Sequence, residues 1–459
     1  MELGQLLPIW SIIPFIGMLL SIAIFPLVRG EWWESHELHV AAFWAAVFLV
    51  PFIIFFGPEI TAEQLSETIV GDYIPFIVLL LGLFVVAGGI HVKGTIVGTT
   101  RNNVILLLIG SFLASWVGTT GAAMLLIRPV LRANQWRRHK AHIVIFFIFT
   151  VANMGGCLTP LGDPPLFLGY LRGVPFFWTL MHIWPLLILN MVLVLIIFVV
   201  LDRRFVAREG AEGKEALELM DAADERTPIG IEGAHNFAFL ALIIVAVILN
   251  GSIPQMEMFI DPATGKTFGI EIFGVHVGVD YVVQIALILV ALTLSWVTTP
   301  KQLRIRNKFE WAPIAEVAKL FIGIFITMIP ALALLRAYGG SIGIDTPLKF
   351  FWATGALSSF LDNSPTYVVL LTAAGAIGST DPTAVATTVG NVAQPMLLAI
   401  SAGAVFMGAV TYIGNAPNFM VKNIAESAGI KMPSFFAYIG WSVAILVPRF
   451  IVDTLLFFL

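Results

Sequence analysis

The residues best suited to chemistry lie in one polar stretch, Ser358 to Tyr367, which interrupts an otherwise apolar region. Its oxygen donors could bind a hard cation or exchange a proton, and they belong to Asp362, Asn363, Ser364 and Thr366. The apolar flanks, residues 350–357 and 368–377, are each shorter than the roughly 20 residues needed to cross a bilayer. The pattern therefore predicts a re-entrant helical hairpin over residues 346–377 with a polar tip. The alternative is a water-facing loop between two ordinary helices.

Composition indicates the class of protein that must position this stretch. The chain has 459 residues, of which 58% are hydrophobic and 12% are charged. Soluble domains carry about 25% charged residues, so we expect an all-α, polytopic membrane protein. The first apolar run, residues 9–28, has no basic region before it and no cleavage motif after it, so we interpret it as a retained helix. The single cysteine, Cys157, excludes an intrachain disulfide and a cysteine-based metal site.

Hydropathy predicts a series of membrane spans with two hairpins between them. The second hairpin is the one already described, and the first covers residues 102–131. The spans cover residues 9–28, 40–57, 73–91, 141–173, 177–201, 235–250, 279–297, 312–337, 391–428 and 435–457. Basic and acidic connections separate onto opposite sides only if both hairpins return to the side from which they came. The positive-inside rule then places both termini outside the cell.

The two halves of the chain contain matching motifs, which predicts an internal repeat. Residues 159–167 and 411–419 share a Gly, then Asp or Asn, then Pro and Phe at one constant offset. Because the two units lie on opposite sides of the charge-defined membrane, we interpret them as inverted repeats. The predicted organisation is an extra first helix (1–39), repeat 1 (40–201), a cytoplasmic linker with an extra helix and an external loop (202–278), and repeat 2 (279–459). The linker itself covers residues 202–233, and residues 212–223 could form a short surface helix.

Interrupted spans at matching places are the best sequence pointer to a transporter's binding site. Glycine and proline break helices, so we expect breaks in the spans 141–173 and 391–428. The residues expected at the breaks and at the second hairpin tip are Gly162, Pro164, Pro165, Gly414, Pro417 and Pro365. The side chains expected to bind the cation or proton are Asp362, Asn363, Ser364, Thr366, Asp163, Asn415, Thr119, Thr120 and Thr159. We place a Na⁺ ion at Asp362 and Asn363, with Asp362 as its main ligand.

At these motifs the chain resembles the ion transporter superfamily, and within it the NhaD-type sodium/proton antiporters and their citrate- and arsenite-transporting relatives. The likeness covers nearly the whole chain and rests on the tip motifs, residues 118–120 and 362–366, together with Asp163 and Asn415. It implies a multi-pass protein of the inner membrane that forms a homodimer through a scaffold domain. It also implies a transport domain of hairpins and broken helices that moves like an elevator. The first tip lacks the Asn or Asp that often occurs there in the family.

Two carboxylates at membrane depth favour a Na⁺/H⁺ antiporter as the first hypothesis, because one desolvated carboxyl group can hold either H⁺ or Na⁺. The alternative is a Na⁺- or H⁺-coupled carrier of citrate, another small carboxylate or arsenite. An enzyme is not expected, since no H-E-x-x-H motif occurs. We expect the lipid bilayer, Na⁺ and H⁺ as partners, and no cofactor and no nucleic acid. Lys319 and Glu316 lie one turn apart and could pair, with Lys319 as a counter-charge or as a residue that reaches the membrane surface.

Overall fold

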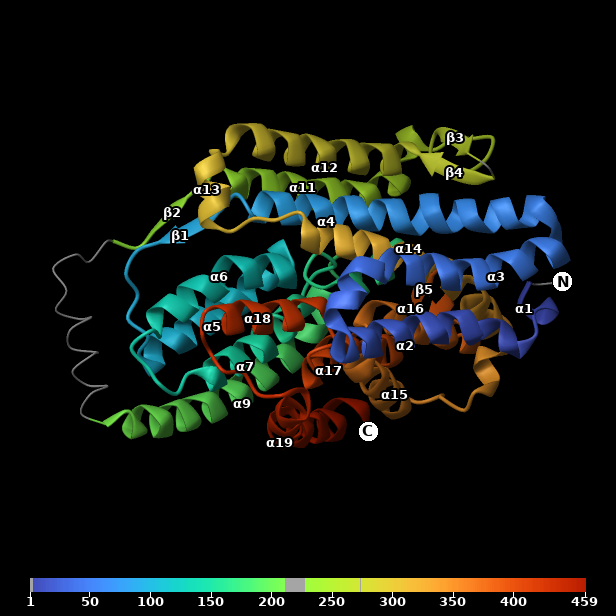
Figure 1. Cartoon of the computed structure of the whole chain (residues 1–459). Coiled ribbons are helices and arrows are strands. Elements are labelled where there is room, and N and C mark those ends of the chain that lie inside the picture. The colour runs from blue at the N-terminus through green and yellow to red at the C-terminus, as the bar shows by residue number, and fades with distance from the viewer. Residues whose placement is uncertain (1–2, 211–227, 273) are drawn as a thin grey trace.

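The protein is built almost entirely from helices, and the computed structural model describes residues 3–210, 228–272 and 274–459 (Figure 1). Within these residues, eight helical segments are long and apolar enough to cross a membrane. This confirms the prediction of an all-helical, multi-pass membrane protein. The segments are Ile9–Val28, Gly30–Ala87, Thr100–Val117, Trp178–Arg208, Asn236–Gln255, Val279–Thr298, Ala312–Ser341 and Phe435–Phe458.

An outer group of helices occupies the upper part of Figure 1, where α4, α11 and α12 run side by side. Helices α2, α3 and α14 pack against one another next to them. The Tyr73 hydroxyl donates to the Ala318 carbonyl oxygen at 2.8 Å and links the start of α4 to α14. The bounds are α1 (Leu3–Leu6), α2 (Ile13–Val28), α3 (Gly30–Ser66), α4 (Ile74–Ala87), α11 (Asn236–Ser252), α12 (Val279–Thr298), α13 (Lys301–Arg306) and α14 (Ala312–Tyr338).

A kink at Gly57 divides the long segment Gly30–Ala87 into two helices. Gly57 has φ +82° and ψ 168°, a backbone conformation that is open essentially only to glycine. Pro58 then starts the second helix, where its missing N–H costs nothing. A π-helical turn, Glu67–Tyr73, joins this helix to α4. The acidic connection that we expected between the spans 40–57 and 73–91 is therefore helical, because Pro58 nucleates a new helix at once.

An inner group contains two pairs of consecutive helices, α5–α6 and α15–α16, and two interrupted spans. Helices α5 and α6 are separated only by Gly118, and the ends away from Gly118 meet again. There, the Gly98 amide donates to the Ala133 carbonyl oxygen at 2.8 Å, and Asn103 and Asn134 exchange side-chain hydrogen bonds. The inner bounds are α5 (Thr100–Val117), α6 (Thr119–Ala133), α7 (Ala141–Thr150), α8 (Pro164–Leu171), α9 (Trp178–Arg208), α15 (Pro347–Phe360), α16 (Asn363–Ile377), α17 (Gln394–Met407), α18 (Ala416–Ser427) and α19 (Phe435–Asp453).

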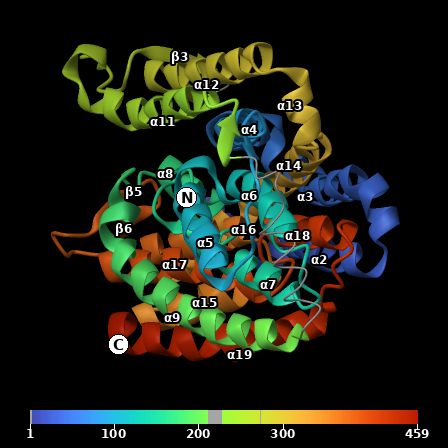
Figure 2. The ribbon, with the colours of Figure 1, turned by 90° about the vertical axis from the view of Figure 1, so that its left-hand side faces the viewer.

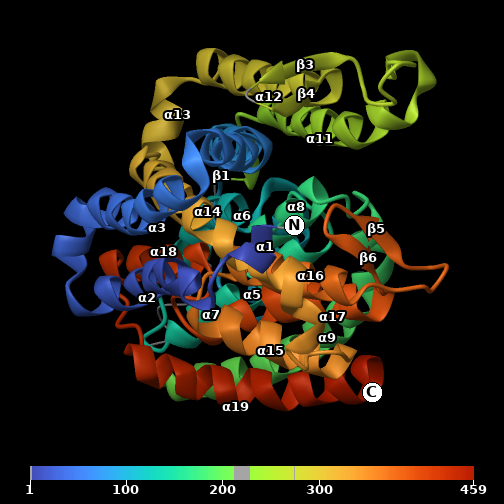
Figure 3. The same ribbon diagram turned by 90° about the vertical axis from the view of Figure 1, so that its right-hand side faces the viewer.

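The broken helices run through the centre of the inner group. Every residue of α7 from His142 to Thr150 is buried, and residues 143–149 form part of the main hydrophobic core. A helix that is apolar all round must be surrounded by other helices. Figures 2 and 3 show α9 and α19 along the edge opposite α11 and α12, with the broken helices and hairpins between them.

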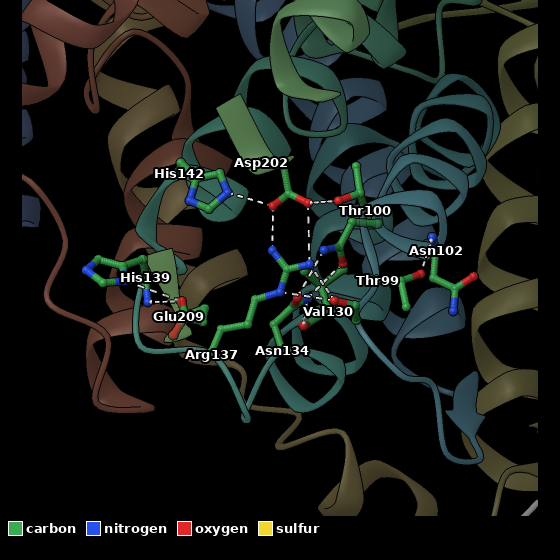
Figure 4. A network of polar contacts seen from close by, with 12 residues as sticks. Thr99, Thr100, Asn102, Val130, Asn134, Arg137, His139, His142, Asp202 and Glu209 are labelled. Atoms are coloured by element: carbon green, nitrogen blue, oxygen red, sulfur yellow. Dashed lines mark hydrogen bonds and ion pairs between the residues drawn. The ribbon is translucent and has the colours of Figure 1, made fainter. Parts of the chain in front are cut away.

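A buried ion pair clamps the open end of the first hairpin to α9 (Figure 4). Arg137 donates to Asp202 at 2.5 Å, and neither side chain is exposed. Asp202 also accepts hydrogen bonds from His142 at 2.8 Å and from Thr100 at 2.5 Å. Asp202 had been expected at the start of the linker, but it lies inside α9, which continues to Arg208. The predicted short helix over residues 212–223 lies outside the described residues.

Short antiparallel strand pairs occur only in the connections of the described chain. Strand β1 (His91–Lys93) pairs with β2 (Gly230–Glu232), β3 (Gly269–Ile272) with β4 (Val275–Gly278), and β5 (Val385–Thr387) with β6 (Gly390–Val392). The β3–β4 pair follows the turn expected near Asp261, where the Ala263 amide donates to the Asp261 carboxylate at 2.9 Å.

Candidate functional site

Four short inner helices, α6, α8, α16 and α18, begin around one buried point. The residues that precede their first turns are Gly118, Asp163, Asp362 and Asn415. An aspartate or asparagine here usually bonds to its own helix, but Asp163 and Asn415 make no such capping bond. Their side chains are therefore available for partners elsewhere in the chain.

Asp163 is the point at which the two halves of the chain meet. Its Oδ1 accepts hydrogen bonds from Thr119 Oγ1 at 3.0 Å and from Asn415 Nδ2 at 3.1 Å. Its Oδ2 accepts a hydrogen bond from Asn363 Nδ2 at 2.7 Å. Asp163 is 1% exposed, and these donors are uncharged. Thr119 comes from the first hairpin, Asn363 from the second hairpin and Asn415 from the second helix break.

Two further asparagines extend this network and were missed by the sequence reasoning. Asn153 Oδ1 accepts from Asn415 Nδ2 at 3.2 Å, and Asn153 Nδ2 donates to Asn418 Oδ1 at 2.7 Å. Asn418 in turn donates to the carbonyl oxygens of Gly408 and Thr411. Both asparagines are completely buried. The available signal was the single carboxamide of the span 141–173, Asn153, because a buried amide needs hydrogen-bond partners.

Asp362 lies at the tip of the second hairpin, between α15 and α16, but its carboxylate bonds to its own helix. Its Oδ1 accepts from the Ser364 amide at 2.9 Å, so its carboxylate caps α16 and remains half-buried. The Thr366 hydroxyl donates to the Asp362 carbonyl oxygen at 2.9 Å. The side chain of Asn363 turns to Asp163 instead. The structure therefore places Asp163, and not Asp362, at the junction of the two halves.

Both spans are interrupted in the structure. Helix α7 ends at Thr150 and α8 begins at Pro164, while α17 ends at Met407 and α18 begins at Ala416. The prolines do not interrupt the helices but start new ones, with Pro164 and Pro165 in the first turn of α8, Pro417 in that of α18 and Pro365 in that of α16. Proline suits this position because its missing N–H has no helical partner there.

The two breaks repeat the same contacts. Thr159 Oγ1 donates to the Ser115 carbonyl oxygen, and Thr411 Oγ1 donates to that of Ser359. Each threonine thereby ties its break to the tip of its own hairpin.

Glycine also permits the same close approach in both breaks. A Cβ atom on Gly162 would lie 2.2 Å from the Gly156 carbonyl oxygen, and one on Gly414 would lie 2.6 Å from that of Gly408.

The two remaining threonines of the predicted site do not bond to Asp163 in the described chain. The Thr159 hydroxyl donates to the Ser115 carbonyl oxygen, and Thr120 is half-buried in the first turn of α6.

The expected pairing of Lys319 with Glu316 is not what the structure shows. Lys319 Nζ lies 2.6 Å from Glu37 Oε1, and Glu37 is buried in α3. The contact joins α14 to α3 in the outer group, because α3 packs along the face of α14 that presents Lys319. Lys319 is therefore not among the hydrogen-bond partners of Asp163.

The donor set around Asp163 limits the chemistry of the site. Among the described residues, no group of three or more His, Cys, Asp or Glu side chains is placed to hold a metal ion. No lysine or arginine in the described chain bonds to Asp163 either. Carboxylate, amide and hydroxyl oxygens favour hard cations and protons over soft metals.

Comparison with known families identifies the chain. A family described as "Putative citrate transport" matches residues 4–458. The chain belongs to this family. A search of curated proteins found no match. The citrate transport family lies within the ion transporter group, so the broad resemblance is confirmed. Its members are transporters, and no catalytic family is indicated.

Proposed function

We propose that the protein is a cation-coupled secondary transporter that carries citrate or a similar small carboxylate. Asp163 holds the coupling H⁺ or Na⁺ in this proposal. The observation that carries it is the convergence of Thr119, Asn363 and Asn415 on Asp163, because these residues come from both hairpins and the second break. The family match supplies the cargo class.

The burial of Asp163 supports a cation or proton at this position. An ionised carboxylate that is 1% exposed inside a membrane protein is costly unless a positive charge neutralises it. Its three donors are neutral and cannot supply that charge. A proton or Na⁺ can, and the neighbouring Thr119 hydroxyl and Asn363 carbonyl oxygen are suitable Na⁺ ligands.

The helix starts support binding of an anion next to the cation. Each helix N-terminus carries a partial positive charge and free N–H groups, and in transporters such ends often face anionic groups of the substrate. Helices α6, α8, α16 and α18 all begin at the site. A carboxylate cargo would approach these ends only after a cation has neutralised Asp163, which couples the two binding events.

We also propose that the two halves are inverted repeats with re-entrant hairpins, and that the inner group moves relative to the outer group. Thr159 and Thr411 make the same contact, as do Gly162 and Gly414, and both pairs share the sequence offset of the matching motifs. The return of α6 to the start of α5 supports a hairpin in the first half.

Na⁺/H⁺ antiport remains the second candidate function, and one observation favours it. In the described chain no basic side chain bonds to Asp163, so cation exchange at this carboxylate would need no bound anion. An NhaD-type antiporter would use the same side chains but would carry no citrate.

Purified protein in proteoliposomes distinguishes the two functions. Labelled citrate uptake is measured under an imposed pH or Na⁺ gradient, and proton flux on Na⁺ addition is measured without citrate. We expect gradient-dependent citrate uptake that is lost in Asp163→Asn and retained in Asp381→Asn, which changes an exposed aspartate in a connection. Sodium-driven proton flux without any citrate uptake would establish the antiporter instead.

A further inference from the structure

A second buried polar cluster lies between α9 and α19 and takes no part in the proposed transport site. It consists of Arg449 and Asp453 on α19 and Asn190 on α9, and we call it the Arg449 cluster. Arg449 is 3% exposed, and the other two residues are fully buried. Arg449 and Asp453 are four residues apart, so they lie on the same face of α19.

The contacts within the Arg449 cluster satisfy only part of its polar groups. Asn190 Nδ2 donates to Asp453 Oδ1 at 2.8 Å and to the Leu186 carbonyl oxygen at 2.7 Å. Arg449 Nη1 reaches Met154 Sδ at 3.1 Å, but a thioether sulfur is a weak acceptor. Arg449 and Asp453 do not form an ion pair with each other in the described chain.

Four polar atoms of the cluster make no hydrogen bond to any of the described protein groups. Two of them, Arg449 Nε and Nη2, are donors, and the other two, Asp453 Oδ2 and Asn190 Oδ1, are acceptors. An unsatisfied buried polar atom costs about 1–3 kcal/mol, and more if it is charged. Both helices are of membrane-spanning length, so bulk water cannot meet this need from the lipid side.

The balance of donors and acceptors indicates what fills the site. An anion would satisfy the Arg449 donors but would be repelled by Asp453, and a cation would do the reverse. The charges of Arg449 and Asp453 already cancel, so no ion is required. Water both donates and accepts, and a buried water typically needs about two to four polar partners.

We propose that the Arg449 cluster is an internal hydration site, in which ordered water molecules bridge Arg449 to Asp453 and Asn190. This water lies beside Met154, which follows Asn153 directly in the chain and is itself completely buried. The site thus brings exchangeable water next to the first helix break.

X-ray radiolytic footprinting of the whole protein in lipid nanodiscs tests this inference. Hydroxyl radicals form from bound water as well as from bulk water, so a buried methionine beside bound water is oxidised. Mass spectrometry should find Met154 converted to the sulfoxide several times faster than Met18 and Met328, which are 0% and 1% exposed in the apolar core. Met258, which is 75% exposed in the connection between α11 and β3, serves as the positive control. Protection of Met154 equal to that of Met18 would overturn the proposal and would indicate a dry, direct Arg449–Asp453 contact.

A double variant checks that the cluster holds the water. Arg449→Met with Asp453→Leu removes both charges and avoids leaving one of them buried and unpaired. We expect the oxidation rate of Met154 in this variant to fall to that of Met18, with the rate of Met258 unchanged. Undiminished Met154 oxidation in a folded double variant would show that the radicals come from another source, and would also overturn the proposal.

Discussion

The Asp163 carboxylate, at the break in the first half, accepts a 2.7 Å hydrogen bond from Asn363, at the hairpin tip of the second half. These residues are 200 positions apart in the chain. The bond joins the start of α8 to the start of α16, so the break and the opposite hairpin are held together at a buried acid. Any ligand that binds Asp163 therefore acts on both halves at once.

We predict that a charge swap between Asp163 and Asn415 restores part of the transport lost in the single variant. Asp163 is the only carboxylate in the hydrogen-bonded group that it forms with Thr119, Asn363 and Asn415. Asp163→Asn removes this carboxylate, so coupled transport should be lost. Asp163→Asn with Asn415→Asp returns one carboxylate to the same hydrogen-bonded group, since Asn415 bonds to Asp163 at 3.1 Å. Transport in proteoliposomes measures both variants. A double variant as inactive as the single one would contradict the idea that one carboxylate at this junction is sufficient.

Asp362→Asn is the comparison that separates binding from helix capping. Asparagine caps helices as well as aspartate does, so the first turn of α16 should persist. Because Asp362 bonds to the Ser364 amide and not across the junction, we expect this variant to fold and to keep a measurable share of transport. Complete loss in a stable Asp362→Asn protein would return the central role to Asp362, as the sequence suggested.

The labelling sides of four new cysteines should reveal whether the hairpins re-enter the membrane. Cys157 is completely buried, so the natural background should be low. Cysteines at Arg101, in the first turn of α5, and at Gln135, just after α6, are expected to react only from the cytoplasmic side. Cysteines at Asp345 and Thr380, which flank α15 and α16, are expected to react only from outside. All four positions are exposed in the structure. Reaction of the two members of a pair from opposite sides would make that hairpin a spanning segment.

Sequence patterns indicated where the helices of α5–α6, of α15–α16 and of the two interrupted spans begin and end, because glycine and proline impose local backbone geometry. The Gly-Asp and Gly-Asn motifs marked both breaks correctly. The sequence could not show which acid faces the other half, since Asp163 and Asp362 both precede a helix and only packing decides which one caps it. The sequence also could not show which acidic residue pairs with Lys319. Glu37 lies 282 residues away in the chain, whereas Glu316 was the nearest acid in sequence.

Gly118→Ala should destabilise the protein. Gly118 has φ +83° and ψ 148°, a region that costs other residues about 1–3 kcal/mol, although a Cβ would meet no atom closer than 3.5 Å. The loss of stability in Gly118→Ala would therefore come from backbone strain at the tip of the first hairpin and not from a steric clash. Gly440→Ala is the matched control, because Gly440 lies inside α19 with open space around its Cβ, and alanine favours a helix by about 1 kcal/mol. Thermal unfolding in detergent should show a lower midpoint for Gly118→Ala alone.

Removal of either charge from the Arg137–Asp202 pair should destabilise the protein more than removal of both. Among the described residues, Arg137→Met leaves Asp202 with His142 and Thr100 as its hydrogen-bond partners. Asp202→Leu leaves Arg137 with the Gly98 carbonyl oxygen and the face of the Trp136 ring, and with no acidic partner. Breaking a buried pair on one side costs about 3–5 kcal/mol, while replacing both partners with apolar residues is often neutral. We therefore expect a clearly lower unfolding midpoint for each single variant and recovery towards the parent value in Arg137→Met with Asp202→Leu. Additive losses in the double variant would show that the two charges stabilise the hairpin independently and not as a pair.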